Sequence, residues 1–133
     1  MDLAVERFKF PLRLLLSAFM IAAGCLHFLN PAPFVKIVPA ALPAPALLVY
    51  ISGFFEILGG IGLLLPPLCQ PASWGLIALF IAVFPANINM AVNDIVLEGI
   101  PHIPWLYWLR LPLQAVLIAW AWWVGQPASE TKD

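Results

Sequence analysis

The stretch PALLVYISGFFEILGGIGLLL, residues 45–65, carries one charged residue, Glu56, in an otherwise largely apolar run. A helix needs about 20 mostly apolar residues to cross the hydrocarbon core of a bilayer, and this stretch is long enough. The whole chain has the same character, since 63% of its 133 residues are hydrophobic and 10% are charged. Soluble domains are about half apolar and a quarter charged. The composition therefore predicts an integral membrane protein surrounded by the lipid bilayer.

The sequence also excludes several partners and cofactors. The formal net charge of −1 gives no electrostatic basis for binding nucleic acid. Cys25 and Cys69 do not form a CxxC pair, so neither a thioredoxin-like redox pair nor a zinc site is indicated. The glycine-rich motifs of nucleotide sites are absent. We expect no nucleic-acid partner, no metal and no nucleotide cofactor.

Three further stretches are long and apolar enough to cross a bilayer. The four predicted spans lie at about residues 11–29, 45–65, 72–92 and 104–124. Prolines mark the joints, as at Pro66 and Pro104, because proline loses no hydrogen bond in the first turn of a helix. The expected fold is an all-α membrane protein. It is an antiparallel bundle of four transmembrane helices, forming a single membrane domain over residues 1–133.

The ends of the spans carry their own signals. Trp105 and Trp108 open the fourth span and Trp120 and Trp123 close it, as expected for aromatic side chains anchored at the two interfaces. The segment FVKIVPAAL at 34–42, between the first two spans, is apolar but broken by proline. We expect it to lie at the membrane interface, with a re-entrant loop as the alternative.

The basic residues predict the orientation. Arg7, Lys9 and Arg13 precede the first span and Lys132 follows the fourth, whereas the first connection has only Lys36. The third connection has no Lys or Arg but contains Asp94 and Glu98. Because Lys and Arg are enriched in cytoplasmic segments, both termini are expected to be cytoplasmic.

Six polar residues inside or at the ends of the spans are the candidate site. Ionisable groups within a membrane are expensive and mark function by default. At about 1.5 Å of rise per residue, His27 lies roughly 3 Å inside the outer boundary, Asn87 and Arg110 roughly 8–9 Å, and Glu56 and Gln114 roughly 15 Å. The predicted polar centre, for binding a ligand or for structure, consists of His27, Glu56, Asn87, Asn89, Arg110 and Gln114.

Helical phase favours convergence of these residues. Ser17, Gly24 and His27 lie on one stripe of the first span, and Gly53, Glu56 and Gly60 lie on one stripe of the second. Small residues on such stripes let two helices approach closely in lipid.

The segment FPANINM at 84–90 places a proline and two asparagines in the third span. Pro85 cannot donate a backbone hydrogen bond and disfavours a regular helix. We therefore expect a broken turn whose Asn87 and Asn89 amides line the outer end of a polar pocket. Interhelical hydrogen bonding by these amides is the alternative.

Glu56 and Arg110 are expected to pair, because an isolated charge costs about 2.5–3.5 kcal/mol at a helix centre. The pair would either hold a polar ligand head or relay a proton, or serve only as a structural link. A neutral, protonated Glu56 and an interfacial His27 without a ligand also remain alternatives.

The chain resembles the DoxX-like family of small bacterial integral membrane proteins over about residues 15–124. The resemblance rests on four segments, His27–Phe34, Ser52–Gly60, Phe84–Ile88 and Arg110–Gln114. It implies a multi-pass four-helix protein of the bacterial cytoplasmic (inner) membrane. The family takes its name from a membrane subunit of a thiosulfate:quinone oxidoreductase, so the resemblance also implies a link to membrane redox complexes.

Three functions compete on this basis. The first is a subunit or accessory of a quinone-linked redox system, with a quinone or similar lipophile in the polar pocket and a membrane redox partner supplying electrons. The second is a non-enzymatic assembly or stabilising protein, alone or as a homo-oligomer. The third is a small proton-coupled transporter, which a polar column would suit but which the lack of an inverted repeat disfavours. The sequence identifies no catalytic residue, so enzymatic activity is left open.

Overall fold

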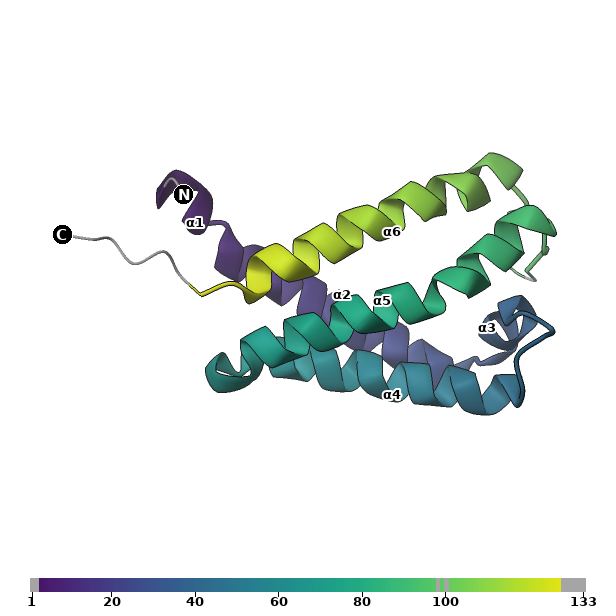
Figure 1. The fold of residues 1–133 in the computed structure, drawn as a ribbon, viewed down its shortest axis with the longest axis horizontal. Coiled ribbons are helices and arrows are strands. Elements are labelled where there is room, and N and C mark those ends of the chain that lie inside the picture. Colours follow the sequence, from purple (N-terminus) through teal and green to yellow (C-terminus); the bar gives the residue numbers. More distant parts are fainter. Residues whose placement is uncertain (1–2, 98, 100, 128–133) are drawn as a thin grey trace.

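The computed structural model describes residues 3–97, 99 and 101–127. These residues form helices joined by turns and loops (Figure 1). Glu98 and Lys132, both used above to predict the orientation, lie outside the described residues. The elements in chain order are α1 (Leu3–Glu6), α2 (Lys9–Leu29), α3 (Ala32–Ile37), α4 (Pro45–Leu64), the 3-10 helix η1 (Pro66–Leu68), α5 (Cys69–Val92) and α6 (Pro104–Gly125).

A long helix occupies each of the four ranges predicted to span the membrane. Proline begins two of them, Pro45 in α4 and Pro104 in α6, as the missing N–H of proline allows. The prolines of η1 separate α4 from α5 and force a tight turn between them. The proline-rich first connection is not simply a loop, because it contains the short helix α3.

Three segments are long and apolar enough to cross a membrane: Ala4–Leu29, Pro45–Leu64 and Pro66–Val92. Helix α6 is long enough but less apolar. It contains Arg110 and Gln114 together with five of the six tryptophans of the chain. Tryptophan has an amphipathic ring that favours the interface over the hydrocarbon core.

The long helices pack in the order α2, α4, α5, α6, and the α2–α4 interface is the most extensive. Helices α2 and α6 also touch, over a smaller interface than those of the other three neighbouring pairs. Their hydrogen bonds lie near the chain termini, where Arg13 donates to the Val124 carbonyl (2.7 Å) and Trp120 donates to the Leu12 carbonyl (3.1 Å). Away from the termini the two helices diverge (Figure 1). Both termini lie at the same end of the molecule, which we call the terminal end, and α3 lies at the opposite end, the α3 end.

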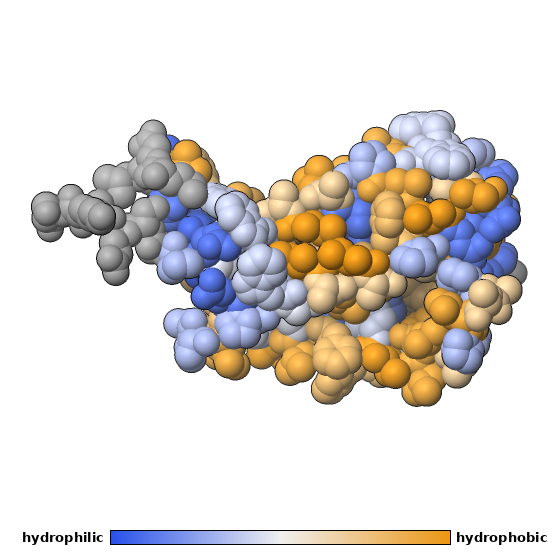
Figure 2. All heavy atoms as spheres, viewed as in Figure 1, coloured by the Kyte–Doolittle hydropathy of each residue, from blue (hydrophilic) through white to orange (hydrophobic). Residues whose placement is uncertain are grey.

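The surface is apolar around the middle of the molecule. Figure 2 shows hydrophobic residues over much of this middle zone and hydrophilic residues gathered at its two ends. Large apolar side chains point outward there, such as Ile81, which is 60% exposed, and Trp74, which is 52% exposed. A contiguous apolar surface of this kind is typical of a membrane-facing surface.

Small residues allow the backbones of α2 and α4 to meet. A Cβ atom added at Gly24 would lie 2.7 Å from the Gly53 carbonyl oxygen, and one added at Gly53 would lie 2.6 Å from the His27 Cβ. Further along the same interface, Ser17 Oγ donates to the Gly60 carbonyl at 2.5 Å. The stripes predicted from helical phase therefore face each other, and we call this contact the glycine seam.

Two apolar clusters fill the interior. The terminal-end cluster includes Leu16, Met20, Leu63 and Phe80, and the α3-end cluster includes Ile37, Met90 and Tyr107. Along α5, the buried Asn87 lies between Phe80 of the first cluster and Met90 of the second.

The predicted broken turn at FPANINM is wrong. Helix α5 runs without interruption from Cys69 to Val92 with Pro85 inside it. The proline costs one backbone hydrogen bond and produces a bend, visible in Figure 1, but the flanking residues keep helical geometry.

We expect Gly24→Ala to destabilise the protein, because its new methyl group would press on the Gly53 backbone and on Ile57. Overpacking of this kind costs about 1–3 kcal/mol. Gly75→Ala is the matched control, because a Cβ added at Gly75 meets nothing within 4 Å. Thermal unfolding in detergent should give a lower midpoint for the first variant and an unchanged or higher midpoint for the second. Equal midpoints would contradict a close α2–α4 contact.

Candidate functional site at the α3 end

His27 and Glu56 meet across the glycine seam. His27 Nδ1 lies 3.0 Å from Glu56 Oε2, and both side chains are buried. The same nitrogen lies 2.7 Å from the Ala23 carbonyl oxygen, one turn back in α2. Because the carbonyl can only accept, Nδ1 directs its proton to it. Glu56 Oε2 is therefore left without a hydrogen bond. The structure thus joins two of the predicted site residues and leaves an unsatisfied carboxyl oxygen between the helices.

Helix α3 covers His27. The Phe34 ring stacks on the imidazole, with ring centroids 3.9 Å apart and an interplanar angle of 18°. Asn89 Nδ2 donates to the Ile37 carbonyl at 2.9 Å, and the Lys36 ammonium donates to the Val96 carbonyl. These bonds hold the first connection against α5 and the loop that follows it. Asn89 therefore fixes α3, a role that the sequence pattern did not assign to it.

Asn87 and Gln114 form a separate, fully buried link between α5 and α6. Asn87 Nδ2 donates to Gln114 Oε1 at 3.3 Å, and Gln114 Nε2 donates to the Phe80 carbonyl at 2.8 Å. Both side chains use neighbouring protein groups as partners. This geometry matches the alternative in which the amides connect helices.

The expected Glu56–Arg110 pair is wrong. Among the described residues, Glu56 forms its ion-pair contact with His27, and Arg110 Nη1 makes only a 3.7 Å contact with Met90 Sδ. Depth along the helices placed the two charges at similar levels but did not fix which faces they share. Glu56 faces α2 across the glycine seam, whereas the cavity-lining Arg110 contacts Met90 of α5.

Arg110 instead lines a cavity at the α3 end. The cavity has a volume of about 230 Å³, and its walls come from α2, α3, α6 and the loop after α5. Its lining residues are Leu26, Asn30, Pro33, Phe34, Ile37, Leu97 and Arg110. Phe34 therefore has two neighbours, the cavity on one side and His27 on the other. Asn30 and Arg110 are the polar side chains of an otherwise apolar lining.

Sequence reasoning missed Phe34 and Asn30, and it expected Asn87 and Asn89 to line the pocket, whereas neither residue lines this cavity. The resemblance had singled out the His27–Phe34 segment, but nothing in its spacing indicated that Phe34 would fold back onto the imidazole. Reasoning from polarity also passed over Ser52 and Tyr107, whose buried hydroxyl oxygens have no hydrogen-bond partner.

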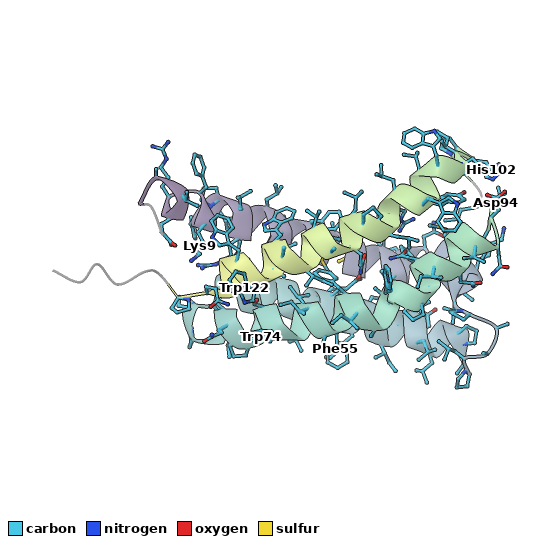
Figure 3. The ribbon with its side chains drawn as sticks, turned by 45° about the horizontal axis from the view of Figure 1, so that its top comes forward. Lys9, Phe55, Trp74, Asp94, His102 and Trp122 are labelled. Carbon is cyan, nitrogen blue, oxygen red and sulfur yellow. The ribbon has the colours of Figure 1, made fainter. Side chains whose placement is uncertain are left out.

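The loop between α5 and α6 adds a polar rim at the same end. His102 Nε2 lies 2.8 Å from Asp94 Oδ1, and both side chains are exposed (Figure 3). Lys9 lies at the opposite, terminal end, within 3.2 Å of Glu6 Oε2. Within the part of the chain that the structure describes, no three His, Cys, Asp or Glu side chains gather as a metal site would require.

Over the described residues, the fold and the site define an all-helical protein with three segments long and apolar enough to cross a membrane and a small, mostly apolar cavity at one end. The chain belongs to the family of the domain of unknown function DUF8561, whose sequence profile matches residues 16–125. No curated protein matches the chain. No solved structure matches it either.

We expect Asn87 and Gln114 to be energetically coupled, and Glu56 and Arg110 to be independent. In a double-mutant cycle, Asn87→Ala and Gln114→Ala should show a coupling energy of about 0.6–1.7 kcal/mol, the range for interhelical hydrogen bonds in membranes. The matched cycle of Glu56→Gln and Arg110→Gln should be additive within about 0.5 kcal/mol. Reversible unfolding in mixed micelles measures both. Strong coupling in the second cycle would restore the Glu56–Arg110 pair.

Proposed function

We propose that this chain is a four-span protein of the bacterial cytoplasmic membrane, a four-helix bundle that binds a lipophilic molecule by its polar head. In this proposal α6 is the fourth span and both termini are cytoplasmic. The protein serves as a subunit or accessory of a quinone-linked redox system, with a quinone as the first candidate ligand. The resemblance to the DoxX-like family supports a role in a membrane redox system. The observation on which the proposal of a ligand rests is the cavity beside Arg110.

The cavity has the composition of a lipophile site. Ligand sites are mostly apolar with a few placed polar groups, and here Arg110 and Asn30 supply hydrogen-bond donors on apolar walls. A volume of about 230 Å³ admits a head group and not a long chain. The chain of such a ligand would therefore extend into the bilayer. A quinone carbonyl needs a hydrogen-bond donor, which the guanidinium provides.

The His27–Glu56 pair lies one ring away from that head group. Both groups exchange protons, and Glu56 Oε2 has no hydrogen bond that would be broken on taking up a proton. Phe34, stacked on His27 and lining the cavity, separates the pair from the ligand space. A phenyl ring carries no proton, so in a redox setting the pair would exchange protons with the ligand only when Phe34 moves aside. Electrons would come from a partner protein.

The second candidate function is structural support of another membrane complex. The observation that favours it is the Asn87–Gln114 link, which is buried and satisfied within the protein. A link of this kind holds α5 against α6 without a ligand. We assign a structural role to these two amides. The proposed ligand site consists of Arg110, Asn30 and the His27–Glu56 pair.

Removing Arg110 should release the ligand and leave the fold intact. Protein purified gently from its own membrane should carry a lipophile that organic extraction and mass spectrometry identify, and Arg110→Met should reduce its occupancy at least tenfold. Gln70→Met, on the other side of the molecule, is the control. Wild-type protein that carries no lipophile would overturn the ligand proposal and favour the structural role.

The proposed orientation places both termini in the cytoplasm. A fluorescent protein fused to either end should fluoresce, because it folds in the cytoplasm, and an alkaline phosphatase fused to either end should be inactive. A fusion in the connection after α5 should show the opposite pattern. Active phosphatase at the C-terminus would exclude this orientation.

A further inference from the structure

We infer that the cavity beside Arg110 holds the anionic head of a membrane amphiphile, a phosphate or carboxylate, whose acyl chain leaves between α2 and α6. The inference rests on the proposed function only in taking the cavity as the site of a lipophile. It makes the head group an oxyanion, for which a neutral quinone would be a poor substitute.

Among the described residues, Arg110 is a cation without an anionic partner. Its guanidinium has five N–H donors, and the structure gives it one hydrogen-bond contact, the 3.7 Å approach of Nη1 to Met90 Sδ. A thioether sulfur is a weak acceptor. Arg110 stands six residues into α6, about 9 Å along the helix axis. A guanidinium at that depth in a bilayer is costly unless an anion or water reaches it.

The charge of the cavity favours an oxyanion. No Asp or Glu lines it, so nothing within its described lining competes for the guanidinium. Phosphate and carboxylate match the planar fork of arginine with two parallel hydrogen bonds, whereas a neutral carbonyl accepts weaker ones. Asn30 adds an amide donor on the opposite, α2 side of the cavity.

The geometry also provides a path for the chain. Leu26, Phe34 and Ile37 form an apolar wall beside the charged group. Helices α2 and α6 are joined near the termini and diverge toward the α3 end, where both contribute residues to the cavity lining (Figure 1). On α6, Leu109 and Leu113 are 43% and 47% exposed and flank Arg110. Trp105, 65% exposed, lies one turn and a half closer to the helix end, at the level where tryptophan marks the interface.

The test uses the full-length protein, stripped of lipid in a neutral detergent and studied by native mass spectrometry and thermal unfolding. The added probes are phosphatidylglycerol, phosphatidylcholine with the same acyl chains, oleate and inorganic phosphate. Phosphatidylglycerol and oleate should bind and raise the unfolding midpoint, with phosphatidylglycerol binding at least tenfold more tightly than phosphatidylcholine. Inorganic phosphate alone should bind far more weakly, since it lacks the chain.

Three variants locate the site. Arg110→Gln should abolish the preference for the anionic head, and Arg110→Lys should retain part of it because the charge remains. Leu26→Trp, which fills the cavity and leaves the charge, should weaken all the amphiphiles alike. Arg7→Gln is the control for an exposed basic residue at the terminal end and should change nothing. If Arg110→Gln fails to fold, the Arg110→Lys and Leu26→Trp variants still decide the question.

Each outcome separates the two proposals. Equal binding of the two phospholipids overturns the inference, and so does an unchanged preference in Arg110→Lys or undiminished binding of the amphiphiles in Leu26→Trp. Inorganic phosphate that binds as tightly as the lipids also overturns the inference. The same holds if a protein subunit is bound in place of lipid and is lost when Arg110 is substituted. Quinone bound without any response to acidic amphiphiles overturns the inference and leaves the proposed function standing. Acidic lipid bound without quinone supports the inference and removes quinone from the proposed function.

Discussion

The close contact between α2 and α4 is the constraint on which the rest of the structure depends. Because neither Gly24 nor Gly53 carries a Cβ, the two backbones meet directly, and His27 reaches Glu56 across the contact. Lipid offers no hydrophobic driving force between helices, so packing and polar contacts must hold them together. The glycine seam supplies the close packing, and Ser17 supplies a polar contact by donating to the Gly60 carbonyl.

Four polar side chains, Glu56, Asn87, Gln114 and Arg110, differ in how well the protein satisfies them; the first three are buried and Arg110 is exposed. Asn87 and Gln114 complete their link with the Phe80 carbonyl, which ties α5 to α6 at the bend near Pro85. Glu56 keeps one oxygen without a hydrogen bond, and Arg110 has only a sulfur contact. Unsatisfied groups are costly in a low-dielectric interior, whereas satisfied ones make it rigid. Asn87 and Gln114 are therefore structural amides, whereas Glu56 and Arg110 retain unused hydrogen-bonding capacity.

Much of this arrangement could be predicted from local pattern. Apolar length located the four long helices, and a three- to four-residue stripe located the faces of α2 and α4 that meet. The Glu56–Arg110 pair failed because depth and charge say nothing about which neighbour a face meets, and Glu56 lies on the α2 side. The broken turn failed because a proline bends a long helix more readily than it ends it when the flanking residues pack. Phe34 could not be placed, since its contact with His27 depends on how α3 folds back.

The open side of the molecule follows from the same packing. Arg13 and Trp120 bind α2 to α6 near the termini, and the glycine seam then holds α2 against α4 along its length. With α2 held by α4 and α6 held by the Asn87–Gln114 link to α5, nothing draws α2 and α6 together at the α3 end. Helix α3 fills only part of that space, because Phe34 packs on His27 and Asn89 fixes Ile37. The cavity is thus a consequence of two tight helix pairs whose outer helices, α2 and α6, are hydrogen-bonded to each other near the termini, and Arg110 lines it.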